Sequence, residues 1–172
     1  MNIICCYKVE ERTEETLRLL SGLPYTVIFI PAVLPDSYEM ALKRYWGQDD
    51  LLVVEHDIIF TVDDIRAVNE HKGLIRAFNY WLYPPTTKQD KINPAHRTHS
   101  EYNKFIPLIV EPEAKICDFY GLGFTFFSKE LQRHAPEWEA GEWFNLDTRI
   151  SKWTYKLGYK CDILGWVEHN HK

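Results

Sequence analysis

The chain has 172 residues, a usual size for one domain with a single hydrophobic core, and 45% of them are apolar, which excludes a disordered chain. A formal net charge of −5 disfavours wholesale electrostatic binding to nucleic acid. No apolar run approaches the roughly 20 residues that span a bilayer and no secretory signal pattern opens the sequence, so we expect no membrane span and a cytoplasmic location.

Strands and helices alternate through the first half of the chain. Runs of apolar and β-branched residues predict strands over 2–8, 26–31 and 51–59, and amphipathic segments between them predict helices that end at Gly22 and Gly47. Such alternation is typical of a parallel sheet covered by helices. The predicted fold class is therefore α/β.

The third predicted strand contains three ionisable residues, Glu55, His56 and Asp57. Strand side chains alternate between the two faces of a sheet, so Glu55 and Asp57 are expected to share a side while His56 points away. Two close carboxylates repel unless a cation lies between them, and oxygen ligands suit Mg²⁺ or Mn²⁺. The alternative is structural: one acid caps the following turn and the other pairs with a Lys or Arg.

Directly after this strand, Thr61 and Asp64 have the spacing of a capping box and predict a short helix. From about residue 84 the regular alternation stops, and we interpret the rest as an extension of the same domain, 1–172. Residues 84–104 predict a long basic loop, either a lid that binds phosphate groups or a solvated excursion. Its basic residues are Lys88, Lys91, Arg97 and Lys104.

Two glycines, Gly121 and Gly123, lie in a strand-like aromatic run, where glycine often marks a bulge or the close approach of a ligand. Ser128 can cap a short helix after that run. The four cysteines show no C-x-x-C spacing, and two of them are adjacent in an apolar strand. Buried, reduced thiols are therefore expected rather than a disulfide framework or a zinc knuckle.

The clearest helix of the chain is expected where apolar residues recur every three or four positions, at Leu146, Ile150, Trp153 and Leu157. Asp147 lies in its first turn, where a carboxylate is also favoured by the helix dipole alone. The tail contains His169 and His171, a pair that can bind metal or can simply belong to a frayed end.

In this order, the segments "VVEHDI", "GLGFTFFSKEL", "WFNLD" and "LGWVEHNH" resemble glycosyltransferases of the GT-A fold over most of the chain. The resemblance implies a Rossmann-like sheet with helices on both faces that becomes mixed in the second half. It also implies a nucleotide-binding half over 1–83 and a half for donor sugar and acceptor over 84–172.

The same resemblance assigns roles to individual residues. Asp57 is implied as the first metal ligand, with Glu55 near the metal or the nucleotide ribose, and His169 or His171 as a further ligand of Mn²⁺ or Mg²⁺. The remaining roles are nucleotide binding by Tyr7 and Lys8, donor-sugar and acceptor contacts at Gly121 and Gly123, and a catalytic base at Asp147. The acid that the family carries just before this base is replaced by Leu146.

The expected function is thus the transfer of a sugar from a nucleoside-diphosphate sugar, most often a uridine diphosphate sugar, to an acceptor hydroxyl. Nucleic acid is a possible but disfavoured acceptor, because the protein is acidic. Two alternatives stay open. One is a metal-dependent phosphoester hydrolase that uses Asp57, His169 and His171, and the other is a non-catalytic module that binds a sugar or a partner protein.

Overall fold

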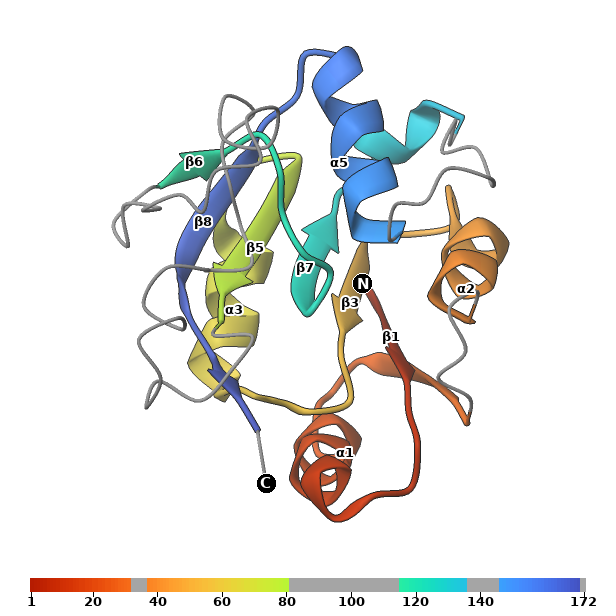
Figure 1. The fold of residues 1–172 in the computed structure, drawn as a ribbon, viewed down its shortest axis with the longest axis vertical. Coiled ribbons are helices and arrows are strands. Elements are labelled where there is room, and N and C mark those ends of the chain that lie inside the picture. The colour runs from red at the N-terminus through yellow and green to blue at the C-terminus, as the bar shows by residue number, and fades with distance from the viewer. Residues whose placement is uncertain (32–36, 81–114, 136–145, 171–172) are drawn as a thin grey trace.

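The computed structural model describes residues 1–31, 37–80, 115–135 and 146–170. They form an α/β fold with a seven-stranded mixed sheet, helices on both of its faces and a separate two-stranded sheet, which confirms the expected fold class (Figure 1). The strands are β1 (Asn2–Cys6), β2 (Thr26–Ile30), β3 (Leu51–Val54), β4 (Ile58–Ile59), β5 (Ile75–Asn79), β6 (Ile116–Cys117), β7 (Phe124–Phe127), β8 (Cys161–Trp166) and β9 (Glu168–His169). The helices are α1 (Glu14–Ser21), α2 (Ser37–Tyr45), α3 (Val62–Glu70) and α5 (Leu146–Lys156), with short 3-10 turns at Glu11–Thr13 and Leu131–Arg133. None of these helices is long and apolar enough to cross a bilayer.

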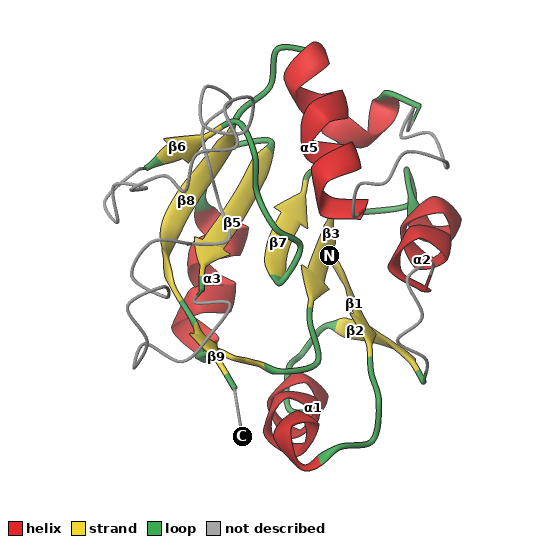
Figure 2. Ribbon diagram, viewed as in Figure 1, coloured by secondary structure: helices red, strands yellow, loops and turns green. Residues whose placement is uncertain are grey.

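The order of strands in the large sheet is β2-β1-β3-β7-β5-β8-β6 (Figure 2). Strands β2, β1 and β3 run parallel, β7 runs antiparallel between β3 and β5, and β8 runs parallel to β5. The carboxyl ends of β1, β3, β5 and β8 therefore lie at one edge of the sheet, together with the amino end of β7. In open α/β sheets that edge is where ligands bind.

Alternate side chains of the strands belong to two hydrophobic clusters, one on each face of the sheet. Helices α2 and α5 cover the first face, and α1 and α3 cover the second. In β1, for example, Ile4 and Cys6 belong to the first cluster, whereas Ile3 and Cys5 belong to the second. The second half of the chain contributes β7 to the middle of the sheet, so both halves share one core.

Several expected boundaries differ from the structure. The strand expected over 51–59 is interrupted, because residues 55–57 form a turn in which the Ile58 N–H donates to the Glu55 carbonyl at 3.2 Å. Strand β1 ends at Cys6 rather than at residue 8. Leu157 lies beyond α5 and is 38% exposed, so it does not extend the buried stripe of that helix.

The helix-end signals in the sequence are confirmed. The Asp64 carboxylate accepts from the Thr61 backbone N–H at 2.7 Å, and the Thr61 hydroxyl accepts from the Asp64 N–H at 3.2 Å, so the capping box of α3 is present. Gly47 and Gly158 follow α2 and α5 with φ angles of 80° and 82°, a region that favours glycine.

A buried ion pair joins the two helices on the first face. Glu39 of α2 accepts from Arg149 of α5 at 2.7 Å and from Lys43 at 2.6 Å, and the Glu39 and Arg149 side chains are 9% and 13% exposed. Burial alone would raise the pKa of Glu39, but the hydrogen bonds from Lys43 and Arg149 outweigh it and lower that pKa. Glu39 therefore stays ionised and holds α5 against α2.

We predict that Arg149→Met lowers the free energy of unfolding by about 2 kcal/mol, because it leaves the buried Glu39 carboxylate with Lys43 alone. The double variant Glu39→Gln/Arg149→Met should recover part of that loss. Urea denaturation monitored by circular dichroism measures both.

The matched control is Arg66→Met, which removes an exposed pair with Asp63 and is expected to cost less than about 0.5 kcal/mol. Equal losses for the two arginine variants would contradict a stabilising role for the buried pair.

Candidate metal centre

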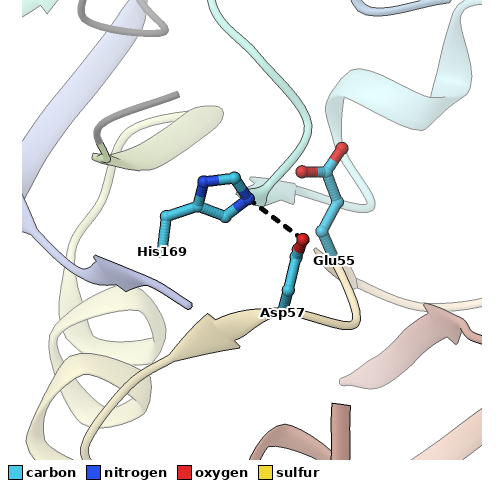
Figure 3. Close-up of side chains that lie close together, drawn as sticks. All are labelled: Glu55, Asp57 and His169. Carbon is cyan, nitrogen blue, oxygen red and sulfur yellow. Dashed lines mark ion pairs between the residues drawn. The ribbon is translucent and has the colours of Figure 1, made fainter. Parts of the chain in front are cut away.

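Three side chains at the carboxyl edge of the sheet converge on one point. Glu55 and Asp57 come from the turn between β3 and β4, and His169 comes from β9 (Figure 3). One potential ligand atom from each residue lies within 4.8 Å of the others, and His169 Nε2 lies 3.1 Å from Asp57 Oδ2. Asp57 is 5% exposed and Glu55 is half-buried. Among the described residues this is the one group of three or more metal-ligating side chains.

Backbone pairing brings the two distant segments together. Strands β4 and β9 form the two-stranded sheet, with Ile58 opposite His169 and Ile59 opposite Glu168. The Asn170 N–H donates to the Asp57 carbonyl at 2.7 Å. The turn that ends β3 therefore places the acids, and the antiparallel pairing places His169 beside them.

Gly123 and Tyr80 lie beside Glu55 and are joined to it by a chain of hydrogen bonds. The Glu55 N–H donates to the Gly123 carbonyl at 2.8 Å, and the Gly123 N–H donates to the Tyr80 hydroxyl at 3.2 Å. A Cβ atom at Gly123 would lie 2.5 Å from two carbon atoms of the Tyr80 ring. The Tyr80 ring in turn lies against the His169 ring, with centroids 5.7 Å apart. Glycine at position 123 thus permits the contact that supports His169.

The site is rich in negative charge. Burial, followed by the charges of Asp57 and Asp147, raises the pKa of Glu55 to about 7, and His169 opposes that shift. Burial also raises the pKa of Tyr80 well above its ordinary value, with further contributions from Glu55 and Asp147. The charge of Asp147 thus contributes to both pKa values, although Asp147 is outside the group of Glu55, Asp57 and His169.

Asp147 occupies the first turn of α5, where the sequence predicted it. Its Oδ1 accepts from the Thr148 backbone N–H at 2.7 Å. Burial nevertheless raises the pKa of Asp147, so desolvation outweighs the hydrogen bonds that favour its ionised form.

The donor atoms fit a divalent cation. Glu55 and Asp57 offer hard carboxylate oxygens, and the His169 imidazole adds a nitrogen ligand that manganese and related ions accept. A cation at this point would favour the ionised form of Glu55 and so offset the burial and the like charges that raise its pKa. The structure brings together three of the four residues that the sequence predicted as ligands, Glu55, Asp57 and His169, and the fourth, His171, lies outside the described residues.

The other expected site residues are placed as follows. Tyr7 and Lys8 follow β1 at the same sheet edge, where Tyr7 packs edge-on against Phe29 and exposed Lys8 lies 3.9 Å from Glu10. Neither has a described contact with Glu55, Asp57 or His169.

The two glycines lie next to β7, in the middle of the sheet. Gly121 precedes β7, and its carbonyl accepts from the Thr125 hydroxyl at 2.6 Å. Both Gly121 and Gly123 lie before the strand rather than inside it. The basic loop expected over 84–104 is outside the described residues.

Sequence reasoning missed two tyrosines. Tyr80 directly follows β5, and Tyr38 of α2 donates to the carbonyls of Cys6 and Val54 at 3.0 and 3.3 Å, joining the ends of β1 and β3. The signal for Tyr80 was its position after a parallel strand. That strand was hidden by Arg76, which is buried in β5 and lies over the Phe126 ring at 4.0 Å.

Comparison with known proteins shows the fold alone. No protein-family model matches the chain, and no curated protein matches it. Among solved structures, the crystal structure of A197 from STIV matches with a TM-score of 0.58 and 14% sequence identity, over 97% of this chain and 83% of that chain. The likeness therefore extends over nearly the whole α/β arrangement and gives no information about activity.

We predict that Glu55→Gln stabilises the metal-free protein above pH 7. The folded pKa of about 7 exceeds the ordinary value of 4.5, so the folded protein keeps a proton that the unfolded chain releases. Wild-type stability should therefore fall as pH rises from about 4.5 to about 7. The neutral glutamine removes that loss and gains on the order of 1 to 3 kcal/mol at pH 8, with a much smaller gain at pH 5.

Urea unfolding at pH 5 and pH 8 in the presence of a chelator measures the free energy of unfolding of the wild type and of Glu55→Gln. Glu70→Gln, at the exposed end of α3, is the control and should match the wild type at both pH values. A Glu55→Gln protein that is less stable than the wild type at pH 8 would show that Glu55 is not under electrostatic strain.

Proposed function

We propose that this protein is a metal-dependent glycosyltransferase that moves a sugar from a nucleoside-diphosphate sugar to an acceptor hydroxyl. The observation that carries the proposal is the convergence of Glu55, Asp57 and His169 at the carboxyl edge of a mixed α/β sheet. Asp147 lies within electrostatic reach of the same point. The order of these residues along the chain is also the order in which the GT-A-like segments occur.

Asp57 and His169, with Glu55 beside them, are the residues that would hold Mn²⁺ or Mg²⁺. When bound there, the ion would neutralise the diphosphate of the donor and make the nucleoside diphosphate a better leaving group. The protein's own part is to keep the acids and the imidazole close before the donor arrives. The pairing of β4 with β9 and the packing of Tyr80 against His169 serve that purpose.

Asp147 is assigned the role of general base in an inverting reaction. It would accept the proton of the acceptor hydroxyl while the oxygen bonds to the anomeric carbon and the bond to the diphosphate breaks. Its raised pKa brings the carboxyl group closer to neutral pH, which suits proton transfer. In a retaining reaction the same carboxylate would only position the substrate.

The proposed nucleotide-binding residues lie near the end of β3. Tyr7 and Lys8 follow β1 beside the end of β3, where they are available to the nucleotide base and its phosphates. A uridine diphosphate sugar is the proposed donor, and the expected location of the reaction is the cytoplasm. The proposed acceptor is an alcohol, to be identified by screening added alcohols in a transfer assay.

A phosphoester hydrolase fits the site less well. Hydrolases of the two-metal type need bridging ligands for a second ion. Within the described part of the chain, the single cluster contains only Glu55, Asp57 and His169, which suits one ion.

We predict that the wild-type protein binds uridine or guanosine diphosphate in the presence of Mn²⁺ and loses that binding when the metal is removed. Asp57→Asn should weaken Mn²⁺-dependent binding by on the order of 100-fold, because it removes a carboxylate ligand while keeping the side-chain shape. Isothermal titration calorimetry with each nucleotide, with and without Mn²⁺, measures the affinities.

Asp63→Asn provides the matched control, since Asp63 is an exposed acid of α3. It should leave the affinities unchanged. Nucleotide binding that is indifferent to Mn²⁺ and to Asp57, or absent altogether, would remove the basis of the proposed function.

We predict that Asp147→Asn separates catalysis from binding. It should lower the Mn²⁺-dependent release of uridine diphosphate from a sugar donor by about 100-fold or more, the range for loss of a general base. Its affinity for uridine diphosphate with Mn²⁺ should stay equal or rise slightly, because the charge of Asp147 contributes to the raised pKa of Glu55.

Release of uridine diphosphate is followed for a panel of uridine diphosphate sugars, with water or added alcohols as acceptor. The control is again Asp63→Asn, which should keep the wild-type rate. If Asp147→Asn kept that rate as well, the assignment of Asp147 as the base would be wrong while the metal site stood.

A further inference from the structure

Two cysteines far apart in the sequence face each other across neighbouring strands. Strand β6 pairs antiparallel with β8, and Cys117 is directly opposite Cys161 in that pairing (Figure 1 shows β6 beside β8). Side chains opposite each other in an antiparallel pair project from the same face of the sheet. Both residues accordingly belong to the hydrophobic cluster that α2 and α5 cover.

The register brings the two α-carbons within reach of a disulfide. The Ile163 N–H donates to the Lys115 carbonyl at 2.8 Å, so by the alternation of antiparallel ladders Cys117 and Cys161 form a hydrogen-bonded pair. The α-carbons of such pairs are about 5.5 Å apart, inside the range found in disulfides. The β-carbons of hydrogen-bonded pairs are typically about 1 to 2 Å farther apart than a disulfide prefers, so closure requires a shift of one strand.

Strand β6 is the element that can make this shift. It has two residues, lies at the edge of the sheet and has β8 as its only strand partner in the described sheet. Its Ile116 is 53% exposed, whereas Cys117 and Cys161 are 3% and 0% exposed. Local opening of a short edge strand costs less than global unfolding, and here it would expose one thiol to a reagent.

We propose that Cys117 and Cys161 are a dithiol that closes into a disulfide when the protein meets a small disulfide oxidant such as oxidised glutathione. This modification site is separate from the candidate metal centre and independent of the proposed transferase activity. Closure would fasten β6, and the segment that leads from it to Gly123, onto the strand that continues to His169.

The exchange takes place in two balanced steps. The Cys117 thiol loses a proton, and its sulfur attacks one sulfur of the oxidant, forming a mixed disulfide and releasing one small thiol. The Cys161 sulfur, after loss of its proton, then attacks the Cys117 sulfur and releases the second small thiol. The protein loses two hydrogen atoms, and one molecule of oxidant is reduced to two thiols. Burial, and then the nearby Cys117, hold the pKa of Cys161 well above its ordinary value, so the second step is expected to be slow at neutral pH.

The adjacent pair Cys5 and Cys6 offers an internal comparison. Consecutive strand residues point to opposite faces, and these two belong to different hydrophobic clusters. Burial raises the pKa of both thiols to about 12. A bridge between them is therefore not expected in the folded protein.

The test starts from fully reduced, natively folded protein incubated with oxidised glutathione. Samples are quenched with acid, alkylated in denaturant, digested and analysed by mass spectrometry. The expected result is a linked peptide pair that contains Cys117 and Cys161, loss of alkylation at these two residues alone, and recovery of both on addition of dithiothreitol. Cys5→Ala should leave the bridge unchanged, and Cys161→Ala should leave a glutathione adduct on Cys117.

Three results would overturn the proposal, and all are read on the wild-type protein, so they do not depend on whether a variant folds. The first is complete alkylation of all four cysteines under conditions in which urea-unfolded protein is oxidised. The second is a glutathione adduct on Cys117 that persists without resolution. The third is a bridge that joins Cys5 to Cys6 instead.

Discussion

Main-chain hydrogen bonds hold the segments that carry Glu55 and Asp57 at one edge of the sheet, and the candidate site depends on them. The Glu55 N–H is bound by the Gly123 carbonyl, and the Asp57 carbonyl is bound by the Asn170 N–H. Asp147 is placed by the first turn of α5. Burial, and then the nearby charges of Asp57 and Asp147, disfavour the ionised form of Glu55 and raise its pKa. The topology of the backbone therefore brings the carboxylates of Glu55 and Asp57 together, and the contact of His169 with Asp57 is made within that frame.

The antiparallel strand β7 makes this convergence possible. A wholly parallel sheet would bring only the ends of strands to the site, whereas β7 runs in the opposite direction and brings its beginning there. Gly123 thus lies between Glu55 and Tyr80, although the three are far apart in sequence. The absence of a side chain at Gly123 is required, because a Cβ atom would overlap the Tyr80 ring. The antiparallel direction of β7 and the glycine at position 123 therefore link Glu55 to Tyr80, the ring that packs against His169.

The sequence was sufficient for the fold class, and it picked out three side chains that the structure brings together, Glu55, Asp57 and His169. Periodicity located α2 and α5, the capping box of Thr61 and Asp64 located α3, and the resemblance to the GT-A fold directed attention to His169. It was insufficient where tertiary contacts override local preference. The isoleucines after Asp57 continued the strand pattern through what is a turn, and buried Arg76 hid β5 and with it Tyr80. The proximity of His169 depends on the register of β4 and β9, which no local pattern specifies.

At an acidic site of this kind, the binding of a cation would be linked to the stability of the folded protein. A cation bound only by the folded protein stabilises it by mass action, and here the cation would also relieve the repulsion around Glu55. The site can therefore remain strained without an ion only if other interactions hold its elements in place. The buried pair of Glu39 and Arg149 does this for α5, since it fastens to α2 the helix whose first turn carries Asp147. Because Arg149 lies two residues beyond Asp147, the position of the Asp147 carboxyl group is maintained by contacts that need no metal.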